Sequence, residues 1–156
     1  MTKTNAMRLL DAAGISYSTR EYEWDESDLS GVHAAEQLDI PAEQVFKTLV
    51  ARGDKTGPLV LCVPVAEEVE LRRAAAVSGN KKVELIHLRE LTALTGYMRG
   101  GCSPIGMKKS FPTYIDETAV LFDEICVSAG MRGEQLVLAP QALADYIGAQ
   151  FAQITD

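Results

Sequence analysis

The sequence predicts a mixed α+β fold, in which a mixed sheet or a partly closed β-barrel is flanked by helices. Helical and strand periodicities alternate in the first half of the chain, whereas short strands follow one another in the second half. The 156 residues, 47% of them hydrophobic and 24% charged, suit an ordinary globular domain. We therefore expect one domain over residues 1–156 and no doubly wound Rossmann sheet.

Helices and strands alternate over the first 86 residues. Apolar residues three and four positions apart predict a helix at 5–13 that Gly14 ends, and strand alternation follows at 15–20, with a possible extension to Trp24. Ser30 can cap a helix whose inward face is expected at Val32, Ala35 and Leu38. Pro41 suits another short helical turn. Further strands are expected at 45–51, 59–65 and 82–86, with a helix at 71–77; the evenly apolar strand at 59–65 is expected in the sheet centre.

The second half is expected to be richer in strands. A helix at 88–95 ends at Gly96 and leads into a glycine-rich loop at 100–109. Strand patterns follow at 113–115, 119–122, 125–128 and 135–138, with a turn at 130–133 before the last of them. Pro140 opens a final helix over 141–147.

Membrane, metal and cofactor binding find no support in the sequence. The longest apolar run, 59–66, falls well short of the roughly 20 residues that span a bilayer. The first residues lack the apolar core of a secretory signal, so a cytoplasmic location is expected. The three cysteines are widely separated without a C-x-x-C pair, and neither histidine has a partner at metal-ligand spacing. We therefore expect no metal and no cofactor.

Charge is distributed unevenly along the chain. The formal net charge is -7, yet residues 47–109 carry eleven basic and six acidic side chains, while the segments on either side are both acidic. Solvated surface charge is one explanation of this pattern. An anionic ligand bound by the middle segment is the other.

Lys47 is the first candidate functional residue. In a strand its side chain shares a face with Val45 and Leu49, which are both apolar. An ammonium group among apolar side chains needs a carboxylate, a path to water or an anionic ligand. Lys47 is therefore either an edge lysine that reaches outward to solvent or a cation that lines a pocket.

The loop from Gly96 to Lys109 is the second candidate. Its glycines permit close approach of backbone amides to a bound ligand, although a tight connector is also compatible with the composition. The segment 101–106 has the glycine spacing of a Walker A loop, but Met107 occupies the place of its lysine. The same segment is one residue too long for the nucleophile elbow of serine hydrolases. Cys102 remains a candidate nucleophile if a neighbouring cation lowers its pKa, while Cys62 and Cys126 are expected to be core residues.

Four segments together resemble the YbaK family of free-standing aminoacyl-tRNA editing domains, which is related to the editing domain inserted in bacterial prolyl-tRNA synthetases. They are the lysine-bearing strand 45–49, the glycine-rich loop 96–109, the segment 114–116 and the strand end 127–130, where Ser128 precedes two small residues. Their order and spacing match the family over nearly the whole chain. The paired lysines at 108 and 109 look more like the cysteine-specific branch than the alanine-specific one.

The resemblance implies deacylation of Cys-tRNA(Pro), with Cys-tRNA(Cys) as a second candidate substrate. Cysteine and proline have similar volumes, so a synthetase pocket cannot reject cysteine strongly and a second site must correct the error. In this family the thiol of the bound cysteinyl group attacks its own ester, so that the protein supplies orientation and electrostatic stabilisation rather than a nucleophile.

The resemblance also implies roles for single residues. Lys47 matches the essential lysine, which holds the terminal adenosine or a phosphate near the carbonyl group. Tyr22 lines the pocket, Gly100 and Gly101 present backbone amides to the ester, and Ser128 seats the aminoacyl group.

Two positions depart from the pattern of the cysteine-specific members. Ser30 stands where they tend to have a bulky apolar residue, and Gln135 stands where they can have an aspartate. Both positions bear on the choice of amino acid, so a deacylase for alanine or another small residue is an alternative. A non-catalytic module that binds tRNA or a synthetase is another. The expected partners are the tRNA(Pro) acceptor end that carries cysteine and prolyl-tRNA synthetase, with salt-sensitive binding to the tRNA.

Overall fold

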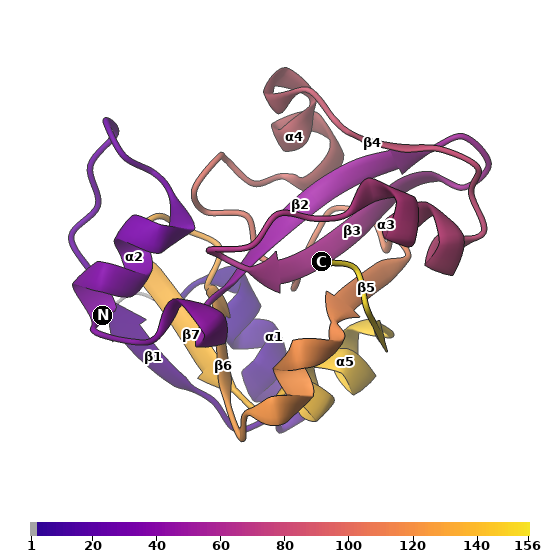
Figure 1. Cartoon of the computed structure of the whole chain (residues 1–156). Helices are drawn as coiled ribbons and strands as arrows, with labels where there is room; N and C mark the ends of the chain where they lie inside the picture. The colour runs from indigo at the N-terminus through magenta and orange to yellow at the C-terminus, as the bar shows by residue number, and fades with distance from the viewer. Residues whose placement is uncertain (1–2) are drawn as a thin grey trace.

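The computed structural model describes residues 3–156, which form two separate β-sheets surrounded by short helices (Figure 1). The larger sheet has the strand order β4-β2-β3-β5-β8, and the smaller has the order β1-β7-β6. Neither sheet closes into a barrel, so the expected mixed α+β fold is confirmed in its open form. The strands are β1 (Ser18–Glu21), β2 (Phe46–Gly53), β3 (Gly57–Pro64), β4 (Val83–Leu85), β5 (Thr113–Asp116), β6 (Ile125–Ser128), β7 (Glu134–Leu138) and β8 (Gln150–Ala152).

Helices cover the faces and the edges of these sheets. In Figure 1, α4 lies above the β2–β3 hairpin and α2 lies beside the smaller sheet. None of the helices in residues 3–156 has the length and apolar character needed to cross a membrane. The helices are α1 (Asn5–Ala13), α2 (Gly31–Leu38), α3 (Leu71–Ser78), α4 (Leu88–Thr95) and α5 (Pro140–Ile147), with 3-10 turns η1 (Ala42–Gln44) and η2 (Glu117–Leu121).

The β2–β3 hairpin is the centre of the larger sheet. Antiparallel pairing sets Lys47 opposite Val63 and continues to the turn between Gly53 and Gly57. Side chains alternate between two cores: Phe46 and Val50 belong to the core that includes α1, whereas Leu49 and Ala51 pack on the side covered by α3. At its beginning, β2 meets the smaller sheet through a parallel bridge between Val45 and Cys126. The two sheets therefore meet within two residues of Lys47.

Most of the expected elements are confirmed, including the buried central strand, which is β3. Cys62 and Cys126 are completely buried, as expected of core residues. The strand expected at 119–122 is wrong, because η2 occupies this segment. Buried Asp116 begins that 3-10 turn: its carboxylate accepts hydrogen bonds from the backbone N–H and the hydroxyl of Thr118, and from the backbone of Ile154 and Thr155. The short edge strand β8, which pairs in parallel with β5, was missed.

Two glutamates lie opposite each other on neighbouring strands of the smaller sheet. Glu21 of β1 lies directly opposite Glu134 of β7, and Glu134 is 7% exposed with an Oε2 atom that lacks a hydrogen-bond donor among the described residues. Burial, together with the neighbouring Glu21 carboxylate, raises the pKa of Glu134. The charged form of Glu134 therefore opposes folding at neutral pH.

The variant Glu134→Gln is expected to stabilise the fold at neutral pH by up to about 1 kcal/mol, the size of a cross-strand like-charge pair. Because the folded-state pKa lies above the unfolded one, stability of the parent falls as pH rises through the raised pKa, and the variant escapes this loss. The gain should vanish well below about pH 4, where Glu134 is protonated in both the folded and the unfolded state. Chemical denaturation at acidic and neutral pH measures both effects. A variant that is less stable than the parent at neutral pH contradicts the assignment.

Candidate functional site

A cavity of about 550 Å³ opens where the two sheets meet. Its walls come from α2, the first half of β2, the segment after β3, the beginning of α4 and the glycine-rich loop that follows α4. Six of the seven residues expected from the sequence line it, although they come from six different segments of the chain: Tyr22, Ser30, Lys47, Gly100, Ser128 and Gln135. The structure therefore gathers the expected site residues around one space.

Lys47 is a half-buried cation in the cavity wall. Its side chain leaves β2 on the same face as Val45, which is buried, and Leu49, which is half-buried. Among residues 3–156, no carboxylate forms an ion pair with Lys47, whereas five ion pairs occur elsewhere in this part of the chain. The ammonium group is therefore available to an anionic ligand.

The free edge of β2 adds backbone groups to the same wall. Val65 donates its N–H to the carbonyl of Val45, which fixes the odd-numbered residues of β2 as the ones that bond to β3. Thr48 therefore directs its N–H and C=O away from β3, on the edge where β4 pairs only with residues 51–53. Thr48 lines the cavity, so this edge offers a hydrogen-bond donor and an acceptor close to Lys47.

The glycine-rich loop approaches the cavity through Gly100, not through Gly101. Gly100 has φ +85° and lines the cavity, and its N–H donates to no group among the described residues. The N–H of Gly101 donates to the carbonyl of Met98 at 3.0 Å. The expected presentation of this second amide to a ligand is therefore wrong: Gly101 instead allows close packing, because a Cβ there would lie 3.1 Å from the backbone of Met131 and Arg132.

Arg132 contacts both the glycine-rich loop and the segment after β1. Its Nε donates to the carbonyl of Arg99 at 2.8 Å, and its guanidinium lies 5.3 Å from the centre of the Trp24 ring. The loop, the turn between β6 and β7 and the segment after β1 are thereby held together at one end of the cavity. Tyr22, which lines this end, donates its backbone N–H to the carbonyl of Gly133.

Ser30 combines a structural role with its place in the wall. As the N-cap of α2, its hydroxyl accepts a hydrogen bond from the N–H of His33 at 3.2 Å. The next residue, Gly31, packs so closely on the end of the β2–β3 hairpin that a Cβ would lie 2.3 Å from Val65 Cγ1. The close packing of α2 thus brings Ser30 to the cavity.

Ser128 and Gln135 face each other across β6 and β7. The Ser128 hydroxyl accepts the N–H of Gly130 at 3.1 Å, which leaves its own hydrogen free to donate. Gln135 is 6% exposed, and its side-chain oxygen has no donor among the described residues. A buried acceptor without a partner in a cavity wall is a feature that a ligand can satisfy.

Sequence reasoning missed several residues of the cavity. Thr48 was missed because its contribution is a backbone edge, which becomes visible only from the pairing of β2. Glu68 follows β3 in a segment for which no element was expected, and Leu85 and Leu88 reach the cavity because β4 and α4 pack beside β2. Arg99 lies in the glycine-rich loop, so its basic charge was a signal that pointed to this wall.

Cys102 lies in the cavity wall but does not have the properties of a nucleophile. Its side chain is 9% exposed, and burial raises its pKa to about 11. The thiol is therefore protonated at neutral pH. In the described part of the chain, moreover, no cluster of three His, Cys, Asp or Glu side chains is arranged to hold a metal ion.

Replacement of Cys102 with alanine is consequently expected to leave ester cleavage within about twofold of the parent rate, since no thiolate is lost. The steady-state rate of cleavage at saturating substrate provides the measurement, with thermal unfolding as a check on packing. Complete inactivation of a folded Cys102→Ala protein would assign the nucleophile to this residue after all.

The chain is similar in sequence to a known protein family and to a curated relative. The family model described as "Aminoacyl-tRNA editing domain" matches residues 29–146. A protein of Enterococcus faecalis (strain ATCC 700802 / V583), named "Putative Cys-tRNA(Pro)/Cys-tRNA(Cys) deacylase EbsC", is 52% identical over 153 residues, which are 98% of this chain and 93% of the relative.

Two solved structures show the same fold. One, described as a "putative trans-editing enzyme for prolyl tRNA synthetase", superposes with a TM-score of 0.84 at 24% identity and covers 100% of this chain and 99% of its own. The other, the "hypothetical protein APE2540", has a TM-score of 0.86 at 19% identity, with coverages of 96% and 97%. With most of its length matched by the family model and a 52% identical relative over nearly its whole sequence, this chain belongs to the aminoacyl-tRNA editing domain family.

Proposed function

We propose that this protein is a trans-editing deacylase that removes cysteine from mischarged Cys-tRNA(Pro), and also from Cys-tRNA(Cys). The observation that carries the proposal is the cavity lined by Lys47, which forms no ion pair among the described residues, by the free backbone edge of β2 and by Gly100, whose N–H has no acceptor in the same part of the chain. The name of the 52% identical relative supports cysteine as the amino acid. A single editing domain over residues 1–156 is part of the proposal.

The cavity suits an ester whose acyl group is small and whose alcohol carries phosphates. Lys47 supplies a cation for the terminal adenosine or for the phosphate next to it. Phe46, Val50 and Leu91 are buried apolar residues of the wall, so the electrostatic attraction acts in a medium of lower dielectric constant than water. Tyr22 closes the end of the cavity near the loop.

In the proposed reaction the substrate supplies the nucleophile. The sulfur of the bound cysteinyl group forms a bond to its own ester carbonyl carbon, the bond from that carbon to the ribose oxygen breaks, and the thiol proton ends on the ribose oxygen. The products are a cyclic thiolactone and deacylated tRNA. The raised pKa of Cys102 supports this route, because the thiol of the wall is not ionised at neutral pH.

Three residues orient the acyl group in this reaction. The amide of Gly100 donates to the carbonyl oxygen as negative charge develops there, while Gly101 only shapes the loop. Ser128 donates its free hydroxyl hydrogen to the acyl group. Ser30 and Gln135 border the space for the side chain and set its size and polarity.

The proposed partners are the acceptor end of tRNA(Pro) and prolyl-tRNA synthetase, which presents the mischarged product. The basic side chains of residues 47–109 are expected to contact tRNA phosphates, so binding should weaken with salt, and the acidic sequences on either side limit the affinity for free tRNA. Such an enzyme acts in the cytoplasm, where tRNAs are charged.

Deacylation of purified Cys-tRNA(Pro), Ala-tRNA(Pro) and Pro-tRNA(Pro) tests the proposal. The expected result is rapid release of cysteine and retention of alanine and proline. Preferential release of alanine would identify the alanine-specific alternative. Release of no amino acid, in the presence of tRNA binding, would identify a non-catalytic module.

A further inference from the structure

We propose that Glu68 binds the α-ammonium group of the aminoacyl ester and thereby makes the cavity prefer substrates with a free amine. The inference rests on the proposed function, since it assigns a part of the same substrate to this residue. It extends the site to the segment between β3 and α3, where neither sequence motifs nor the comparisons place a functional residue.

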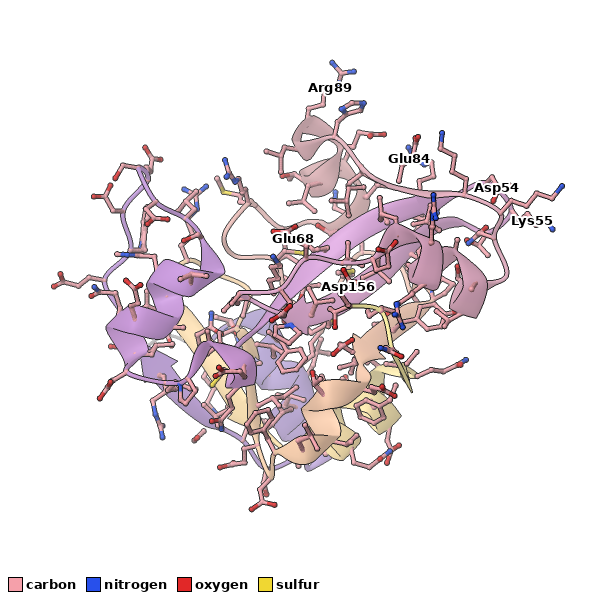
Figure 2. All side chains as sticks on the ribbon, in the orientation of Figure 1. Asp54, Lys55, Glu68, Glu84, Arg89 and Asp156 are labelled. Carbon is pink, nitrogen blue, oxygen red and sulfur yellow. The ribbon has the colours of Figure 1, made fainter. Side chains whose placement is uncertain are left out.

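Glu68 is the one carboxylate that lines the cavity in the described part of the chain. The other charged side chains of the wall are Lys47 and Arg99, and neither of them forms an ion pair with Glu68. Figure 2 shows Glu68 near the centre of the view, on the segment that joins β3 to α3, well away from the hairpin tip at Asp54 and Lys55. An exposed carboxylate and two cations thus share one cavity without neutralising each other.

This arrangement complements the charges of an aminoacylated terminal adenosine. The phosphate is anionic and the α-amine of the acyl group is cationic, on opposite sides of the ester that reacts. A cavity with cations at some positions and a carboxylate at another can orient such a molecule in one direction only. Lys47 for the phosphate and Glu68 for the ammonium define that direction.

A second, independent feature points to a ligand with several hydrogen-bond donors. The side-chain oxygen of buried Gln135 has no donor among residues 3–156, and the carbonyl of Thr48, which also belongs to the wall, lies on the edge of β2 that β4 does not reach. An ammonium group has three N–H donors, so it can bond to Glu68 and still donate to other acceptors of the wall. The wall therefore holds more acceptors than its own residues satisfy, as an amine-binding site requires.

The test compares substrates with and without the amine. The kcat/KM of the parent, Glu68→Gln and Glu67→Gln proteins is measured with Cys-tRNA(Pro) and with N-acetyl-Cys-tRNA(Pro), which keeps the thiol and the ester. The ratio of the two values isolates the amine, because any change in attraction to the tRNA phosphates affects both substrates equally. Glu67 is the matched control, since it is an exposed neighbour that does not line the cavity.

We expect the ratio to fall about threefold to fivefold in Glu68→Gln, as for a partly exposed ion pair, and to stay constant in Glu67→Gln. The fall should appear in KM and not in kcat, and it should shrink in high salt. An unchanged ratio in Glu68→Gln overturns the inference while leaving the deacylase in place. Failure of the parent to release cysteine from the free-amine substrate overturns the proposed function instead.

If the acetyl group alone stops turnover in the parent, competitive inhibition supplies the same comparison. Two stable adenosine amides are used, one with a cysteinyl group and one with a mercaptopropionyl group, which lacks the amine. Glu68→Gln should weaken only the cysteinyl inhibitor, again by about threefold to fivefold. Equal inhibition constants for the parent and the variant with the cysteinyl compound contradict the role of Glu68.

Discussion

Lys47→Ala is expected to lower kcat/KM for deacylation of Cys-tRNA(Pro) by about a hundredfold or more, because without the cation that holds the terminal adenosine or its phosphate the ester is misplaced relative to the Gly100 amide. The reason is the position of Lys47 in the cavity wall, where no carboxylate of the described residues neutralises it. The fold should remain intact, because the Lys47 side chain is half-buried and forms no ion pair with any described residue, while the backbone pairing with Val63 does not depend on the side chain. Single-turnover kinetics measure the rate, and thermal unfolding measures the fold.

Lys55→Ala is the matched control for this variant. Lys55 lies at the tip of the same hairpin, far from the cavity, and its loss removes the same charge (Figure 2). A general weakening of attraction to tRNA would therefore affect both variants alike. We expect near-parental rates for Lys55→Ala, and equal losses in the two variants would show that Lys47 contributes only net charge.

Substrates without a thiol are expected to be cleaved at least about a thousandfold more slowly than Cys-tRNA(Pro), because an intramolecular nucleophile has an effective concentration far above that of any solute. Ser-tRNA(Pro) is the sharpest comparison, since it differs from the cysteinyl ester by one atom, an oxygen in place of the sulfur. Its hydroxyl fits the same space and remains protonated. Deacylation of both esters is followed under single-turnover conditions.

The released product separates substrate-assisted cleavage from attack by water. Mass analysis at early times should detect the thiolactone, which later opens to cysteine. Rapid cleavage of Ser-tRNA(Pro) would mean that the protein activates a water molecule. The substrate thiol would then not be the nucleophile, although the proposed role of Lys47 in binding the substrate would still hold.

The site was predictable where a residue type conflicts with its surroundings. Lys47 interrupts an apolar strand, and so long a glycine-rich loop as the one after α4 is unusual for a connector, so both were candidates before any contact was known. Gly101 shows the limit of that reasoning: its composition allows amide presentation, but its N–H is taken by the carbonyl of Met98. This hydrogen bond depends on the backbone conformation of the loop, which no simple sequence pattern predicts.

The fold was predictable where periodicity is strong and ambiguous where segments are short. The apolar residues at 119–122 suggested a strand, but the buried carboxylate of Asp116 stabilises a 3-10 turn there. Strand β8 has three residues, too few for alternation to be recognised, and it forms because β5 offers it an edge. The place of Glu68 in the site, like strand β8, could not be predicted from the sequence, because only the tertiary fold brings this residue to the cavity.

The most direct test of the account is the rate of cysteine release from Cys-tRNA(Pro) by the parent and Lys47→Ala proteins, with Ala-tRNA(Pro) and Pro-tRNA(Pro) measured alongside. We expect the parent to release cysteine fast and to release neither alanine nor proline, and we expect cysteine release to be almost completely lost in a Lys47→Ala protein that unfolds at the parental temperature. Equal release of cysteine by the two folded proteins would contradict it.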